Sequence, residues 1–141
     1  MSKPNDRSWG KFIPEHYNKM GPGITMYNLG QYWECHEYLE DLWREDMGDN
    51  ARYVYWAIIQ VATSLYHYEG KNLIGAWGML FKAKDKIHKC EKLLVENSFM
   101  DEYLQWNNFK KLIVEIPRGC LLEDFNNLYQ FKFPSFRECK G

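Results

Sequence analysis

Apolar side chains recur every three or four residues through the middle of the chain, the spacing that places them on one face of an α-helix. The pattern predicts three long helices, over residues 31–47, 53–68 and 72–95. The first is amphipathic, because acidic residues occupy many of the positions between its apolar ones. The second is apolar on almost every side, which is typical of a central helix. In the third, Asn72 is a suitable N-cap, and a row of lysines is expected to form a solvent-exposed face.

Shorter elements are expected on either side of these helices. A proline and a glycine are placed to open and end a short helix over residues 22–30. Weaker periodicity predicts two further helices, near residues 102–115 and 121–129. Proline and glycine interrupt residues 1–21, so we expect an irregular N-terminal arm there. The aperiodic residues 131–141 are expected to form an extended C-terminal tail.

The helices follow one another as antiparallel pairs. Turns at Gly30 and Gly70 each join one helix to the next, so residues 22–95 are interpreted as two successive helix hairpins. A hairpin cannot bury both of its faces alone and must stack on another. We therefore expect an all-α fold, a compact bundle of stacked antiparallel helix hairpins, in a single helical domain over residues 22–130.

Charge and cysteine content exclude several classes of partner. The formal net charge of the 141-residue chain is -1, so no overall positive field attracts nucleic acid or anionic lipid. The four cysteines are far apart and have no zinc-ligand spacing. No stretch has the length and apolarity of a membrane span, and the N-terminus does not resemble a secretory signal. We therefore expect a cytoplasmic protein with reduced thiols and no cofactor, and with no nucleic-acid or membrane partner.

One stretch of the chain resembles a known family. Residues 27–43 read Tyr-Asn-x-Gly-x-Tyr-Trp-Glu-Cys-His-Glu-x-Leu-Glu-x-Leu-Trp, which resembles the signature of the domain of unknown function 309 family. Segments between residues 60 and 76 follow in the same order and at similar spacing to that family's second block. The resemblance extends over about residues 22–95 and departs at Cys35, where alanine is expected. It implies a small helical bundle with no established activity.

The most suggestive local motif is formed by His36, Glu37 and Glu40. On a helix, His36 and Glu40 are one turn apart and project in nearly the same direction, as the two metal ligands of an H-E-x-x-H helix do. His67, on the second long helix, is the best candidate for a third ligand. Gln60 shares the face of His67, so these few polar residues of two apolar helices are expected to meet across the interface between the helices.

Two interpretations of this polar cluster stay open. In the favoured one the cluster is structural, because a buried imidazole needs a hydrogen-bond partner and paired polar side chains would bridge the helices. The chain would then be a small helical scaffold or interaction module without catalytic activity, whose partner is another protein or a second copy of itself. The alternative is a metal-dependent enzyme that uses His36, Glu37, Glu40 and His67.

Aromatic residues near the two ends favour the homodimer. They would form exposed patches unless the ends fold back or a second chain covers them. The residues concerned are Trp9 and Phe12 in the arm and Phe131, Phe133 and Phe136 in the tail.

Overall fold

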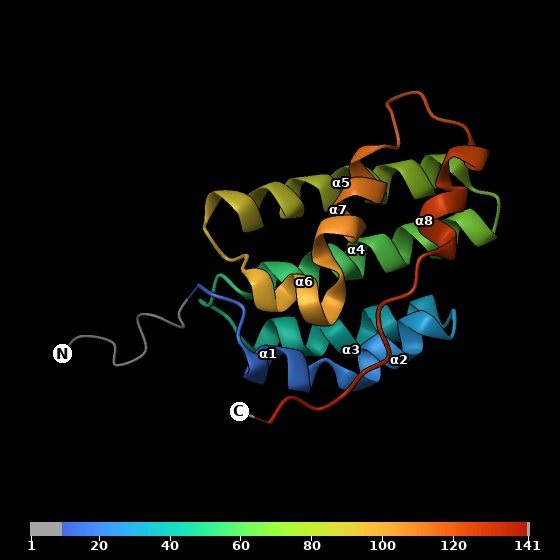
Figure 1. Cartoon of the computed structure of the whole chain (residues 1–141). Coiled ribbons are helices and arrows are strands. Elements are labelled where there is room, and N and C mark those ends of the chain that lie inside the picture. The colour runs from blue at the N-terminus through green and yellow to red at the C-terminus, as the bar shows by residue number, and fades with distance from the viewer. Residues whose placement is uncertain (1–9, 141) are drawn as a thin grey trace.

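The computed structural model describes residues 10–140, and all regular structure within them is helical (Figure 1). This confirms the predicted all-α fold. No helix in this part of the chain is long and apolar enough to cross a membrane. The elements are, in chain order, α1 (Pro14–Lys19), α2 (Gly21–Asn28), α3 (Tyr32–Glu45), α4 (Arg52–Glu69), α5 (Leu73–Lys92), α6 (Ser98–Leu104), α7 (Trp106–Val114), the 3₁₀ helix η1 (Leu122–Phe125) and α8 (Asn126–Gln130).

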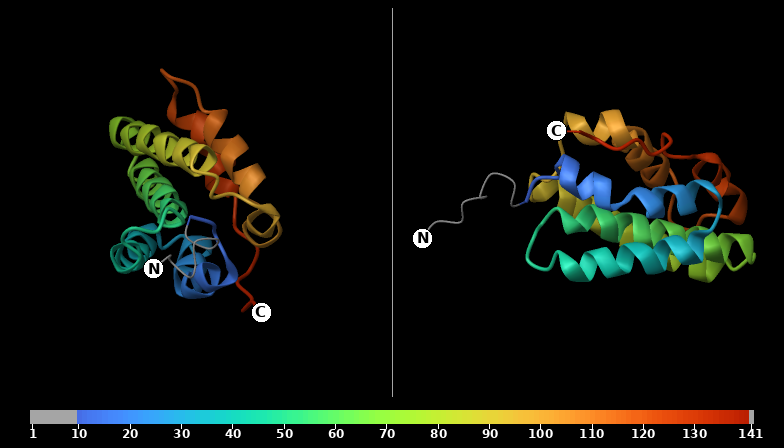
Figure 2. Two further views of the ribbon diagram at one scale, coloured as in Figure 1. Left: turned by 90° about the vertical axis from the view of Figure 1, so that its left-hand side faces the viewer. Right: turned by 90° about the horizontal axis from the view of Figure 1, so that it is seen from below.

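The long helices α3, α4 and α5 run alternately up and down, with α4 between the other two (Figure 2). Eleven of the 18 residues of α4 are buried, which makes it the central helix that its all-round apolar sequence predicts. Inside its contact with α5, the hydroxyl of Ser64 donates a hydrogen bond of 2.6 Å to the carbonyl of Ala76. Since α2 packs on α3 and α4 packs on α5, the bundle consists of stacked hairpins, as predicted.

The turn between α4 and α5 shows why the two helices approach closely. The side-chain oxygen of Asn72 accepts a hydrogen bond of 3.0 Å from the backbone N–H of Gly75, which confirms the predicted N-cap. A Cβ atom at Gly75 would lie only 2.7 Å from Cγ of His67. A side chain at position 75 would therefore push the imidazole of His67, and with it the end of α4, away from α5.

The N-terminal arm differs from the prediction, because residues 14–19 form the helix α1. Pro14 occupies its first turn, where the missing N–H costs nothing. Tyr17 is fully buried, with its ring 5.0 Å from that of Tyr103. A helix of six residues is stabilised by such tertiary packing rather than by periodicity, so the sequence pattern does not reveal it. Residues 1–9, with Trp9, lie outside the described part.

The C-terminal residues 131–140 contain no regular structure and run back across the bundle towards α1 (Figure 1). Phe131 and Phe133 are buried against the chain's own helices, and so is Phe12 at the other end. The argument for a homodimer from exposed aromatic ends is therefore wrong for these three rings, since the chain covers them itself.

Candidate functional site

The predicted polar residues lie on α3 and α4, two helices that pack on each other. An aromatic contact marks each end of the interface between them: the rings of Trp33 and Tyr66 are 5.2 Å apart, and those of Trp43 and Trp56 are 4.8 Å apart. Between these contacts, the sides of the two helices face each other. These two contacts are made by aromatic residues and not by the predicted polar residues.

On α4, a row of residues at four- and three-residue spacing lies between α3 and α5, because its first member, Trp56, contacts Trp43 of α3 and Lys86 of α5. It consists of Trp56, Gln60, Thr63 and His67, and we call it the α4 strip. Gln60 and Thr63 are only 6% and 8% exposed. The Thr63 hydroxyl donates to the carbonyl of Ile59 on its own helix, at 2.9 Å, so it makes no bridge to α3.

The two histidines are joined through aromatic rings rather than through each other. The ring of His36 lies 4.7 Å from that of Trp33, which contacts Tyr66, and the ring of Tyr66 lies 5.8 Å from that of His67. Nδ1 of His36 donates to the carbonyl of Trp33 at 3.2 Å, and Nδ1 of His67 accepts from the amide of Asn72 at 3.4 Å. Each imidazole is thus oriented by its own helix or by the turn that follows it.

The acidic members of the predicted cluster do not complete a metal site. Glu40 is paired with Arg44 at 3.5 Å on its own helix, and Glu37 is exposed. Within residues 10–140 no group of three or more His, Cys, Asp or Glu side chains is arranged to hold a metal ion. The structure therefore does not assemble the ligand set that a metal-dependent enzyme would need from these residues.

Two buried polar atoms near the α4 strip have no hydrogen-bond partner among the described residues. They are the side-chain oxygen of Gln60 and the indole nitrogen of Trp43. An unsatisfied buried polar group costs about 1–3 kcal/mol. Neither of these two atoms therefore makes a hydrogen bond that would bridge α3 and α4.

Opposite charges border the α4 strip on its two sides. The helix α3 contains five acidic residues and one arginine, whereas α5 contains five lysines and two acidic residues. Glu37 and Glu40 share a side of α3 with Trp33, which faces α4. Lys82 and Lys89 share a side of α5 with Lys86, whose ammonium lies 4.4 Å from the ring of Trp56.

The sequence predicted a solvent-exposed row of lysines on α5, but this row is only partly exposed. Lys86 is only 8% exposed, because its stem and charge pack on the tryptophan of α4. Lys84 turns the other way and donates to the carbonyl of Ile116 at 2.7 Å. Only part of this row is therefore a solvated face.

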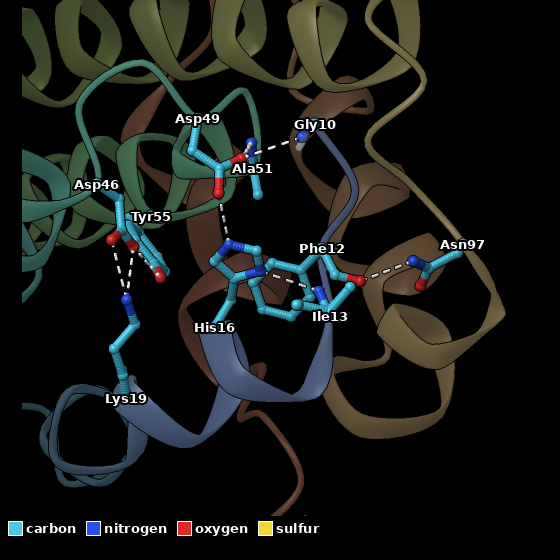
Figure 3. A network of polar contacts seen from close by, with 10 residues as sticks. All are labelled: Gly10, Phe12, Ile13, His16, Lys19, Asp46, Asp49, Ala51, Tyr55 and Asn97. Atoms are coloured by element: carbon cyan, nitrogen blue, oxygen red, sulfur yellow. Dashed lines mark hydrogen bonds and ion pairs between the residues drawn. The ribbon is translucent and has the colours of Figure 1, made fainter. Parts of the chain in front are cut away.

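Sequence reasoning missed a second polar centre, in which His16 of α1 meets Asp49 of the turn between α3 and α4 (Figure 3). Nε2 of His16 and Oδ2 of Asp49 are 2.9 Å apart, and the two residues are 5% and 9% exposed. Oδ1 of Asp49 accepts from the backbone N–H groups of Gly10 and Ala51, at 3.1 and 2.9 Å. The pair is separated by 33 residues without any periodic pattern, so no sequence signal indicated it.

The hydrogen bonds determine the tautomer of His16 and exclude it as a catalytic base. The backbone N–H of Ile13 donates to Nδ1 at 3.0 Å, so the ring proton is on Nε2 and points to Asp49. Burial alone would raise the pKa of Asp49, but hydrogen bonds from His16, Ala51 and Gly10 outweigh it and lower that pKa below its usual value. With both ring nitrogens engaged, the imidazole connects the N-terminal segment to the bundle and has no free lone pair to accept a proton from a substrate.

A neighbouring ion pair strengthens the same corner of the fold. Lys19, at the end of α1, lies 2.9 Å from the carboxylate of Asp46, and the hydroxyl of Tyr55 donates to this carboxylate at 2.8 Å (Figure 3). On the other side of His16, the amide of Asn97 donates to the carbonyl of Phe12 at 2.7 Å. These contacts hold α1 against the bundle from three directions.

Comparison with known proteins gives a family match and one relative. Residues 22–79 match the family described as "Domain of unknown function (DUF309)", which confirms the resemblance seen in the sequence. The chain is 34% identical over 78 residues to the "Uncharacterized protein YpuF" of Bacillus subtilis (strain 168). That match covers 55% of this chain and spans only 44% of the relative. No solved structure matches the chain significantly.

Proposed function

We propose that the chain is a non-catalytic interaction module that pairs with a second copy of itself across the α4 strip. The observation that carries this proposal is the opposite charge on the two borders of the strip. Glu37 and Glu40 lie on the α3 side, and Lys82 and Lys89 lie on the α5 side. Complementary potentials of this kind orient partners and select the correct one.

A twofold axis that runs along the α4 strip, parallel to α4, makes such a face complementary to itself. In a symmetric dimer the same surface is used by both copies, so α3 of one copy meets α5 of the other, and this contact occurs twice. Each contact then brings an acidic side against a basic side. A twofold axis perpendicular to α4 would instead place α3 against α3 and α5 against α5, where like charges repel.

Half-exposed aromatic rings at one end of the α4 strip also support pairing with a second copy. Trp33 and Tyr66 are 43% and 46% exposed although their rings contact each other. Aromatic side chains are enriched at the centre of protein interfaces, where they bury a large area at little cost in conformational entropy. A second copy would remove both rings from water.

Charge reversal tests the proposal. One variant combines Glu37→Lys with Glu40→Lys, and the other combines Lys82→Glu with Lys89→Glu. Each variant alone opposes like charges at both contacts, so we expect its dimer to weaken by about tenfold or more relative to wild type. An equimolar mixture restores opposite charges at both contacts and is expected to form a heterodimer. Sedimentation velocity of the single and mixed samples, with one variant fluorescently labelled, measures both effects.

A matched control reverses two charges elsewhere, with Lys111→Glu and Glu123→Lys on exposed positions far along the chain. This control is expected to associate as wild type does. A wild type that sediments as a monomer at tens of micromolar contradicts the proposal. So does a mixture of the two reversed variants that shows no heterodimer.

A further inference from the structure

The C-terminal residues 131–140 are held by asparagine side chains rather than by a helix or strand partner. The amide nitrogen of Asn28 donates to the carbonyl of Phe133, and the N–H of Phe133 donates back to the amide oxygen, both at 2.9 Å. Asn18 makes the same pair of hydrogen bonds with Cys139, both at 2.8 Å. Asn28 is the last residue of α2 and Asn18 lies on α1, so each of these two helices holds one residue of the tail by a pair of hydrogen bonds.

Each of these asparagines satisfies both backbone polar groups of one tail residue. The contact is therefore independent of that residue's side chain, as are the main-chain hydrogen bonds by which proteins bind extended peptides. The two gripped residues are six positions apart, and the hydroxyl of Tyr17 accepts from the N–H of Arg137 between them, at 3.1 Å. The tail is thus bound through its backbone at three points.

Aromatic side chains of the tail occupy defined places between these points. The ring of Phe133, 2% exposed, lies 4.8 Å from that of Tyr27 and 5.1 Å from that of Phe109 on α7. The ring of Phe136 stacks 5.0 Å from that of Tyr17. A Cβ atom at Gly21 would come within 2.9 Å of the Phe136 ring, so the lack of a side chain there makes room for it.

An open hollow continues beyond the last of these rings. It has a volume of about 490 Å³, and Phe136 forms one of its walls together with Pro22, Thr25 and Met26 of α2. The surface that receives the tail therefore extends past the space that the tail itself fills.

We propose that this surface, formed by Tyr17, Asn18, Gly21, Tyr27, Asn28 and Phe109, is a binding site for extended peptides with the spacing Phe-x-Phe-x-x-Phe. In the isolated chain it is occupied by the chain's own residues 131–140. The partner is an extended segment of another protein with the same aromatic spacing, which binds when it displaces the tail. Backbone hydrogen bonds to the two asparagines supply affinity, and the aromatic places supply specificity.

The tail acts as a tethered competitor in this arrangement. A segment joined to its binding site by a short link has an effective concentration in the millimolar range. A free peptide of the same sequence must therefore compete poorly against an intact tail and well against a tail whose covalent link has been cut. This difference separates a bound ligand from a permanent part of the core.

The experiment uses the full chain with a protease site inserted between Gln130 and Phe131, cleaved after folding. The probe is a fluorescein-labelled peptide of residues 131–141 with serine in place of Cys139, followed by fluorescence anisotropy. We expect micromolar binding to the cleaved protein and at least tenfold weaker binding to the uncut protein. Asn18→Ala and Asn28→Ala in the cleaved protein are each expected to weaken binding several-fold.

Two controls accompany these variants. Asn108→Ala changes an exposed asparagine of α7 and is expected to leave binding unchanged, and a peptide with Phe133→Ala is expected to bind at least tenfold more weakly. Loss of the helical circular-dichroism signal on cleavage overturns the proposal, because the tail would then be part of the core. Failure of the labelled peptide to exchange within a day, or equal binding by the asparagine variants, overturns it as well.

Discussion

Replacing Asp49 by asparagine isolates the contact between this residue and His16. Asparagine has the same shape and retains an oxygen that accepts from the N–H groups of Gly10 and Ala51. It places an N–H donor where Oδ2 now faces Nε2 of His16 at 2.9 Å. His16 cannot move its proton to the other nitrogen without losing the hydrogen bond from Ile13. Two buried donors would therefore face each other.

The cost of this substitution follows from the partners that it orphans. Leaving a buried donor without an acceptor costs about 1–3 kcal/mol, so we expect Asp49→Asn to lower the free energy of unfolding by about 2 kcal/mol. Asp49→Ala also orphans the two backbone N–H groups and should cost about 3–4 kcal/mol. For a chain of this length each kcal/mol corresponds to about 3–5 °C in Tm, so the asparagine variant should melt about 6–10 °C below wild type.

The same contact predicts how stability depends on pH. The pKa of Asp49 is lowered on folding, so its contribution to stability is complete above the ordinary value of 3.8 and is lost as the pH falls through the lower folded value. The asparagine side chain does not titrate. The difference in unfolding free energy between wild type and Asp49→Asn should therefore be constant near neutral pH and shrink below about pH 3.8.

Urea denaturation followed by circular dichroism, at pH 7 and at several values down to pH 2.5, measures both effects. A midpoint for Asp49→Asn equal to that of wild type at pH 7 would refute the role of the buried pair. A stability difference that stays unchanged down to pH 2.5 would show that the titration of Asp49 is not linked to folding.

Three other outcomes follow from burial. Leu65→Ala, at a fully buried position of α4, should lower the free energy of unfolding by about 2–5 kcal/mol in urea titrations. Lys86→Ala should lower the free energy of unfolding by about 1–2 kcal/mol, because the stem and charge of Lys86 pack on the ring of Trp56. The control Lys82→Ala should change it by no more than about 0.5 kcal/mol. Equal effects of the two substitutions would contradict this packing. Burial raises the pKa of Cys35 to about 12, so with a thiol reagent at pH 8 only the partly exposed Cys139 should react rapidly in the native protein.

The long helices were predictable because burial is strongest where the sequence is most periodic. The apolar residues 53–68 correspond closely to α4, Arg52–Glu69, and the N-cap at Asn72 lies where the sequence placed it. The helix α1 was not predictable, because six residues contain too few turns for a period to be read. Its stability comes from Tyr17 and His16 meeting residues far along the chain.

The candidate polar residues were predictable as members of two helices that pack on each other, and their contacts were not. The three- and four-residue spacing of Gln60, Thr63 and His67 puts them on one side of α4, but the imidazole of His67 lies beside Gly75 in the first turn of α5. Helix register then puts aromatic rings, Trp33 and Tyr66, at the closest approach, so the imidazoles of His36 and His67 contact these rings instead of each other. Spacing within one helix cannot reveal the register between two helices, which depends on how their side chains interlock.

The segments without helical periodicity obey a different rule, which concerns the backbone. Buried N–H and C=O groups outside helices need partners that no regular ladder supplies, and short polar side chains provide several of them here. The carboxylate of Asp49 accepts hydrogen bonds from the N–H groups of Gly10 and Ala51. The amide of Asn97 donates to the carbonyl of Phe12. The amide oxygen of Asn28 accepts from the N–H of Phe133. These short polar residues are inconspicuous in the sequence, yet each holds an irregular segment that would otherwise expose unpaired backbone to the core. Each end of the described chain is therefore positioned by several such side chains, so a substitution at one of them should weaken the attachment of that terminal segment while the helices stay folded.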